Sequence, residues 1–291
     1  MKPLRVALIH YDNVRQYHRM VGFWTYEVPE FEVTHIGVKE RFRYRLSEFA
    51  RDFDVIVRED HRTHGSFVRD ANIPVAYYVV DSTLSGGHYK ARLGPAKDAD
   101  LILVEHDRLS RFGGLGPPVR RFGYCVNDKL FHDYHLDKAV DVGMYCRVSG
   151  APHRRELMDW LEAFCDERGY IFAGGKRVQI KYAQAFNRTR ISVNLSRTVT
   201  NRPHRVFDAM ACRTCLLTSS LPPVSGEVRT AGTHYLEFRE WDDLTDTIDR
   251  VLASGEWQSI ADQGHELVHK QHTWAIRARE LRQVFAEEFG L

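Results

Sequence analysis

The sequence lacks long hydrophobic runs and has few cysteines. No segment of the 291 residues approaches the ~20 apolar residues that a membrane-spanning helix needs. The apolar run near the N-terminus is too short for the core of a signal peptide. The five cysteines are mostly far apart, which argues for reduced thiols rather than a disulfide framework. These absences predict a soluble, cytoplasmic protein without a membrane span.

The sequence also lacks an excess of charge of either sign. With a formal net charge of +2, any attraction for a polyanion has to come from a local patch. The segment KERFRYR offers one, because it alternates Lys39, Arg41, Arg43 and Arg45 with Phe42 and Tyr44. Interleaved cations and aromatic rings can hold phosphates and stack bases, so DNA is one partner to consider. The alternative is a half-buried aromatic face with solvated arginines.

Several cofactor and metal motifs are absent. No G-x-G-x-x-G follows the first apolar run, where the sequence reads HYDNVRQY, so a dehydrogenase loses its main support. Cys212 and Cys215 form a C-x-x-C that follows a predicted helix, whereas a redox motif precedes one. No second cysteine or histidine pair completes a tetrahedral zinc site. We therefore expect buried structural thiols, no bound metal and no organic cofactor.

Short β-branched runs alternate with helical patterns, which is typical of βα units in a parallel sheet. A first series of strands is expected near residues 4–10, 31–38, 53–60, 74–81, 98–106 and 118–127. After a connection at 127–139, a second series is expected near 140–148, 170–175, 190–197, 214–219 and 234–238. The pattern predicts an α/β protein with domains at 1–130 and 139–291, each doubly wound and Rossmann-like. Their strand ends are expected to face each other across a cleft.

The segment RPHRVFDAMAC (202–212) predicts a helix with an unusual start. Arg202, His204 and Arg205 place positive charge where the helix dipole favours anions. The free N–H groups of a helix that follows a strand and a loop also make a ready phosphate site. Asp208 lies three residues after Arg205 and so on the same face. It either pairs with Arg205 or accepts hydrogen bonds from ribose hydroxyls, and the alternative for the whole segment is a solvated basic face.

Other candidates follow from their place at the ends of strands, where doubly wound sheets bind ligands. Arg147 and Lys176 follow strands of the second series. In the first series, Asp81 ends a buried strand and His88 follows in a glycine-containing loop. Either side chain could orient an acceptor hydroxyl or assist its deprotonation, with His10 and Asp12 as secondary candidates. The alternative is that Asp81 caps the next turn.

Three segments resemble one family. NRPHRVFDAMACRTCLLTS is similar to the R-x-F-E-A-M-A-C-G-T-L-L-L-T segment of CgeB-like glycosyltransferases, bacterial and phage proteins related to the large retaining family with the GT-B fold. AVDVGMYCRVSGAPHRRELMDWL resembles the first strand of their nucleotide domain and the following helix. Residues 241–286 resemble their closing helices, including the H-T-W-x-x-R spacing. The likeness covers residues 139–286 well and the first half in outline.

The resemblance implies roles for individual residues. Asp208 takes the acidic position that contacts the ribose of the donor, and Arg205 takes the arginine position that faces its diphosphate. The glycine of the first strand is Gly143, and the resemblance places it in the donor site with Arg147. Arg213 stands where the family has glycine, and Thr200 stands where larger relatives have a second glutamate. The family's C-terminal helix could pack back on the N-terminal domain.

We therefore expect a metal-independent glycosyltransferase of the hexosyltransferase type. It would move a sugar, with retention of configuration, from a donor such as a UDP-sugar to an acceptor hydroxyl. A hydroxymethylated base in phage-type DNA is one expected acceptor, and a polysaccharide, a protein or a small molecule are others. Two further alternatives are a nucleotide-sugar epimerase and a protein that binds sugar nucleotides without catalysis.

Overall fold

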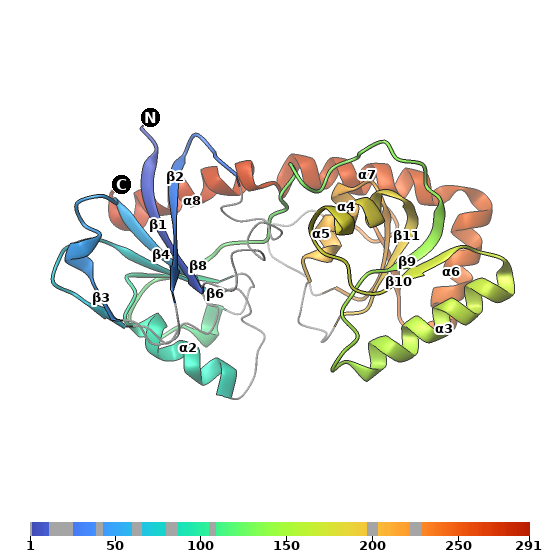
Figure 1. Cartoon of the computed structure of the whole chain (residues 1–291), viewed down its shortest axis with the longest axis horizontal. Coiled ribbons are helices and arrows are strands. Elements are labelled where there is room, and N and C mark those ends of the chain that lie inside the picture. The colour runs from blue at the N-terminus through green and yellow to red at the C-terminus, as the bar shows by residue number, and fades with distance from the viewer. Residues whose placement is uncertain are drawn as a thin grey trace. The chain divides into compact units, whose positions relative to one another are not determined.

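The computed structural model describes residues 2–11, 26–38, 43–59, 66–79, 87–104, 109–196, 203–221 and 229–291. The chain divides into two compact units (Figure 1). Unit 1 consists of residues 1–124 and 274–291, and unit 2 consists of residues 125–273. The expected domains ended at 130 and began at 139, whereas the division falls between Tyr124 and Cys125, and residues 274–291 belong to unit 1.

Unit 1 is built on a six-stranded sheet in the order β2-β1-β4-β6-β7-β8, with every pair parallel. Its strands are β1 (Leu4–Tyr11), β2 (Phe31–Val38), β4 (Val55–Glu59), β6 (Val75–Val79), β7 (Leu101–Val104) and β8 (Val119–Arg121). A separate parallel pair is formed by β3 (Arg43–Arg45) and β5 (Ser66–Val68). The central strands β4, β6 and β7 are buried along their whole length, as strands covered on both faces must be.

Helices flank this sheet. Within the described segments they are α2 (Gly87–Lys97), α8 (Trp274–Phe289) and two short 3-10 turns, η2 (Leu46–Glu48) and η3 (Leu109–Arg111). Although α8 is the last helix of the chain, it packs on β2 near the start of the chain. The ring of Phe31 stacks on Trp274 with centroids 6.2 Å apart, and it meets the Phe285 ring edge-on at 6.0 Å. Both helix side chains are fully buried, so this contact ties residues 274–291 to unit 1.

Unit 2 contains a five-stranded parallel sheet in the order β10-β9-β11-β12-β13. Its strands are β9 (Val140–Met144), β10 (Phe172–Gly174), β11 (Thr189–Asn194), β12 (Cys215–Ser219) and β13 (Leu236–Phe238). The helices are α3 (Pro152–Arg168), α4 (Gln179–Asn187), α5 (Arg205–Ala211), α6 (Trp241–Ser254) and α7 (Glu256–Gln271). From β9 to β12, strands and helices alternate as the sequence pattern predicted.

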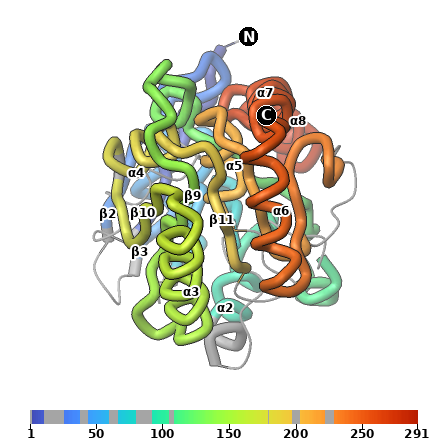
Figure 2. Tube along the Cα trace, turned by 90° about the vertical axis from the view of Figure 1, so that its right-hand side faces the viewer, coloured from blue at the N-terminus to red at the C-terminus, as the bar shows by residue number. Residues whose placement is uncertain are grey.

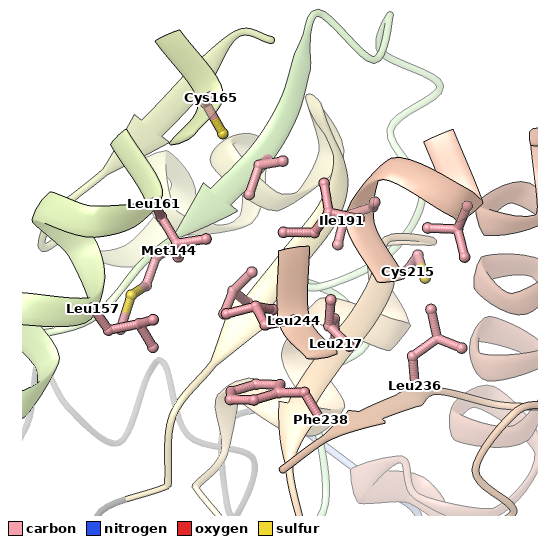
Figure 3. Close-up of a cluster of buried hydrophobic side chains, with 14 of the residues drawn as sticks. Met144, Leu157, Leu161, Cys165, Ile191, Cys215, Leu217, Leu236, Phe238 and Leu244 are labelled. Atoms are coloured by element: carbon pink, nitrogen blue, oxygen red, sulfur yellow. The ribbon is translucent and has the colours of Figure 1, made fainter. Parts of the chain in front are cut away.

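The main core of unit 2 lies between this sheet and two of its helices. Leu157 and Leu161 are one turn apart on α3, and they belong to the same cluster of buried side chains as Leu244 of α6 and Leu217 of β12 (Figure 3). All four side chains are fully buried, and each contributes roughly 1.5–3 kcal/mol relative to exposure. The two helices lie side by side in Figure 2, and the ring centroids of Trp160 and Trp241 are 5.3 Å apart. In the described part of the chain, no helix is long and apolar enough to cross a membrane.

The end of α5 explains the arginine that stands where related sequences have glycine. The N–H of Arg213 donates to the carbonyl of Met210 at 3.0 Å, and the N–H of Thr214 donates to the carbonyl of Ala209 at 3.2 Å. This pair of bonds is the Schellman motif, which needs a left-handed residue at the Arg213 position. Arg213 has a φ of 54°, a conformation that costs a non-glycine residue about 1–2 kcal/mol.

Hydrogen bonds to two carboxylates offset the energetic cost of the left-handed conformation of Arg213. Its Nε donates to Asp262 at 2.6 Å, and one terminal nitrogen donates to Asp133 at 3.2 Å. These hydrogen bonds raise the pKa of Arg213. They connect the end of α5 to α7 and to the segment that precedes β9.

We predict that Arg213→Ala lowers the free energy of unfolding by about 1 kcal/mol more than Arg213→Gly does. Both variants lose the two ion pairs. Alanine has a Cβ atom and is strained in the left-handed conformation, whereas glycine adopts it without strain. Urea denaturation of the two variants and the wild type measures the difference. Equal stability of the two variants would show that the backbone conformation carries no cost here.

Candidate functional site

An arginine connects the start of α5 to the end of β11. Arg205 is the first residue of α5, and its Nε donates a hydrogen bond to Oδ1 of Asn194, the last residue of β11. Asn194 is only 1% exposed, and its Nδ2 donates to Oγ1 of Thr218 on β12 at 2.7 Å. Since these parallel strands end at the same edge of the sheet, Arg205 lies at the carboxyl edge, where doubly wound sheets bind ligands.

The two terminal nitrogens of Arg205 have no hydrogen-bond or ion-pair partner among the described residues. In particular, Arg205 does not form the ion pair with Asp208 that the sequence offered as an alternative. The side chain is partly exposed. A guanidinium whose terminal N–H groups are open in this way presents the fork that binds phosphate or carboxylate through two parallel hydrogen bonds.

Asp208 is buried one turn after Arg205. The residue is 5% exposed, and burial raises the pKa of its carboxyl well above the usual 3.8, although the charge of Arg205 lowers it in part. No side chain in the described segments donates a hydrogen bond to this carboxylate. Because an ionised group buried without a partner is unfavourable, Asp208 is a candidate for contact with a ligand that brings hydrogen-bond donors.

The other predicted residues of unit 2 lie around the same edge. His204 is the residue before α5, and its side chain does not cap the helix. Arg147 follows β9 and Lys176 follows β10, and both are exposed. All strands of the sheet are parallel, so these cations share the carboxyl edge with Arg205. Arg202, by contrast, lies outside the described residues.

Gly143 is buried within β9, where a neighbouring ring accounts for the absence of a side chain. A Cβ atom at this position would lie 2.8 Å from Cε2 of Tyr145. The Tyr145 hydroxyl is 2.7 Å from Oγ1 of Thr189, so the ring is fixed over the glycine. Close packing of Tyr145 therefore requires glycine here, and contact with a donor stays a prediction.

Sequence reasoning missed one further arginine at this edge, Arg154. Burial raises the pKa of Cys146 just beyond β9, and the positive charges of Arg205 and Arg154 act in the opposite direction. Arg154 is in the first turn of α3, which carries no acidic residue. The sequence signal was the same as for α5, a cluster of cations at a helix start where the dipole disfavours them.

A family model described as glycosyl transferase-like matches residues 136–283, which is slightly more than half of the chain. The chain belongs to the glycosyl transferase-like family. The matched segment runs from the connection before β9 into α8 and includes Arg205 and Asp208. No curated protein matches the chain by sequence.

Solved structures with a similar fold are glycosyltransferases. Sucrose-phosphate synthase from Thermosynechococcus elongatus has 13% identity and a TM-score of 0.60, over 99% of each chain. HepE from Anabaena, in complex with UDP and glucose, has 10% identity and a TM-score of 0.64, over 98% of this chain and 100% of HepE. A glycosyltransferase from Rickettsia africae has 9% identity and a TM-score of 0.62, over 99% of each chain. These likenesses confirm the predicted α/β fold of the GT-B type.

The described residues include only some of the predicted residues of the first half. Asp12, Asp81, Lys39 and Arg41 lie outside the described residues. His88 is the second residue of α2, and Arg43 is the first residue of β3. Arg45 is exposed, and its contact with Asp70 is a long one of 3.4 Å.

The aromatic side of the KERFRYR segment is partly internal. The ring of Tyr44 meets Phe49 edge-on at 5.5 Å and lies 6.4 Å from Phe67. Tyr44 therefore packs against a hydrophobic core. This favours the interpretation of a half-buried aromatic face with a solvated Arg45, rather than a ring that is open to a base.

The described carboxyl edge of unit 1 contains buried polar residues on adjacent strands. His10 of β1, Glu59 of β4 and Tyr78 of β6 are all at most 3% exposed. Strand register places Glu59 beside Tyr78 and, one step beyond the Ile9–Arg58 pair, beside His10. Sequence reasoning had named His10 as a secondary candidate, and the register shows which residues accompany it.

The C-x-x-C is not arranged for redox or metal chemistry. Cys212 and Cys215 are free and buried, and burial raises the pKa of both thiols, to about 12 for Cys215. A raised pKa disfavours the thiolate that both chemistries need. Within the described residues, no group of three or more histidine, cysteine, aspartate or glutamate side chains could hold a metal ion.

We predict that Asp208→Asn stabilises the protein by about 1 kcal/mol at neutral pH, because it removes a buried charge. Since the folded protein raises the pKa of Asp208 above 3.8, the folded state binds the proton more tightly. The wild type should therefore lose stability as the pH rises from about 4 through the raised pKa, and the variant should lose less. Thermal unfolding across this pH range measures both effects. Asp159→Asn, on the exposed side of α3, is the control, and parallel pH profiles for wild type and Asp208→Asn would contradict the prediction.

Proposed function

We propose that the protein transfers a sugar from a nucleotide-diphosphate sugar to an acceptor hydroxyl, and that the start of α5 binds the donor. The observation that supports this proposal most is the hydrogen bonding of the Arg205 guanidinium. Its Nε is held by Asn194, and its terminal nitrogens have no partner among the described residues. A phosphate of the donor fits this arrangement in charge and in hydrogen-bond geometry.

Asp208 completes the proposed donor site. The ribose of a nucleotide carries two hydroxyls, and each can donate a hydrogen bond to a carboxylate. Asp208 is buried, and no other described residue donates to it. Ribose binding would therefore supply hydrogen-bond donors to a buried carboxylate that is otherwise unfavourable. This gives nucleotide recognition a physical basis in this chain.

The same arginine supports the chemical step. As the bond between sugar and phosphate breaks, negative charge develops on the departing diphosphate. Donors that are already in position stabilise this charge without reorganisation during the reaction. Arg205 would provide two such donors, with Lys176, Arg147 and Arg154 adding positive charge. We propose that these cations take the role that a divalent ion has in metal-dependent transferases.

The proposed donor and stereochemistry come from the similar structures and from the sequence of the α5 segment. HepE, which shares the fold, has been solved with UDP-glucose, so a UDP-hexose is the first donor to test. The resemblance of the α5 segment to CgeB-like enzymes supports retention of configuration. For the acceptor we propose a hydroxyl that Asp81 and His88 would orient. DNA with hydroxymethylated bases is one acceptor to test, because the resemblance to CgeB-like enzymes includes phage proteins.

The test is incubation with a panel of UDP- and GDP-sugars, with and without acceptors, followed by mass spectrometry. The acceptor panel includes DNA with hydroxymethylated pyrimidines, polysaccharides and small alcohols. The proposal predicts a mass increase of one sugar on an acceptor. Interconversion of UDP-sugars without an acceptor would instead establish an epimerase, and donor binding without turnover would establish a binding protein.

We predict that Arg205→Ala lowers kcat/KM by about 10²–10³-fold, the usual loss for one donor to a developing charge. The fold should stay intact, because Arg205 is partly exposed at a helix start. Arg188→Ala is the matched control, since Arg188 is exposed beyond α4 and precedes β11, at the opposite edge of the sheet. Wild-type kcat/KM in Arg205→Ala would refute the assignment.

A further inference from the structure

Two buried polar residues connect the strand ends beneath Arg205. Asn194 and Thr218 are register partners on β11 and β12, and their exposed fractions are 1% and 0%. Both lie on the face of the sheet opposite the cluster that contains Val193 and Leu217. Polar side chains buried this completely need hydrogen-bond partners, and the partners they have form a single directed chain.

The last hydrogen bond of the series determines the direction in which all of these hydrogen bonds are donated. The Thr218 hydroxyl donates to the carbonyl of Ser219 at 2.9 Å. A hydroxyl has one proton, so its oxygen must accept from Asn194, whose Nδ2 lies at 2.7 Å. This fixes which side of the Asn194 amide is nitrogen, and Oδ1 consequently faces Arg205.

The orientation of the Asn194 amide determines which edge of the Arg205 guanidinium is available to a phosphate. Because Oδ1 of Asn194 faces Arg205, it accepts a hydrogen bond from the Nε–H of the guanidinium. A guanidinium is planar, so a hydrogen bond at Nε restricts the rotation of the whole group. The edge formed by the two terminal nitrogens then points away from Asn194, and this is the edge that binds a phosphate through two parallel bonds.

We infer that Asn194 and Thr218 are positioning residues that hold the Arg205 guanidinium in the orientation that binds the diphosphate of the donor. The inference rests on the proposed function, because it takes a nucleoside diphosphate as the ligand of Arg205. Neither residue needs to touch the ligand. Their effect is to reduce the conformational freedom that Arg205 would otherwise lose on binding.

The alternative is that these contacts serve only to join β11 to β12. A structural role and a positioning role make different predictions. A purely structural pair would affect stability and would change the binding of all ligands alike. A positioning pair acts through Arg205, so it affects phosphate binding selectively. It also has no effect once Arg205 is removed, because coupled residues are not additive.

The experiment compares Asn194→Ala, Thr218→Val and Thr218→Ser with the wild type. Thr218→Val has the same shape without the hydroxyl, and Thr218→Ser keeps the hydroxyl. Titration with UDP and with uridine gives the two dissociation constants, and thermal unfolding verifies the fold of each variant. We expect Asn194→Ala and Thr218→Val to weaken UDP binding about tenfold, and uridine binding less than about twofold, which is roughly one hydrogen bond to a charged group. Thr218→Ser should bind UDP like the wild type.

A double-mutant cycle then tests the route through Arg205. In the Arg205→Ala background, Asn194→Ala should cause no further loss of UDP affinity. With the natural substrates, Asn194→Ala should reduce kcat by a larger factor than it raises KM. The inference is wrong if UDP and uridine weaken equally, if UDP affinity is unchanged, or if the two substitutions are additive. A wild type that does not bind UDP or another nucleoside diphosphate would instead overturn the proposed function together with the inference.

Discussion

The hydrogen bond from Arg205 to Asn194 is the interaction on which the site of unit 2 depends. A cation at a helix start is opposed by the helix dipole, by about 0.3–1 kcal/mol at an exposed position. Asn194 offsets this cost and fixes the guanidinium at the end of β11. The other end of α5 is held as firmly, since Arg213 bridges Asp133 and Asp262. A short helix that is fixed at both ends presents Arg205 and Asp208 from a rigid support, as precise binding requires.

Asp208 shows that the site is maintained at a cost in stability. Its carboxyl is buried, its pKa is raised by that burial, and Arg205 is close enough to lower the pKa without forming an ion pair. Selection for stability alone would favour a neutral residue here. In the proposed donor site, the two groups would bind different parts of one ligand, Arg205 its phosphates and the carboxylate of Asp208 its hydroxyls.

Much of this arrangement could be predicted from the sequence, because it follows from local patterns. Alternating strands and helices, the cationic helix start and the one-turn spacing of Arg205 and Asp208 are all visible in consecutive residues. The partners Asn194 and Thr218 were not predictable, since they become neighbours only through the register of β11 and β12. Arg213 was unexplained for the same reason, as Asp133 and Asp262 lie 80 and 49 residues away in the chain. The assignment of residues 274–291 to unit 1 could not be predicted either, because it depends on a contact between residues far apart in the sequence, the packing of Trp274 on Phe31.

The most direct test of the account is a crystal structure of the protein with UDP bound. The account predicts diphosphate oxygens within hydrogen-bond distance of both terminal nitrogens of Arg205 and a ribose hydroxyl on the carboxylate of Asp208. It also predicts that Nε of Arg205 still donates to Asn194. A diphosphate bound away from α5, or an Arg205 that turns to pair with Asp208, would contradict it.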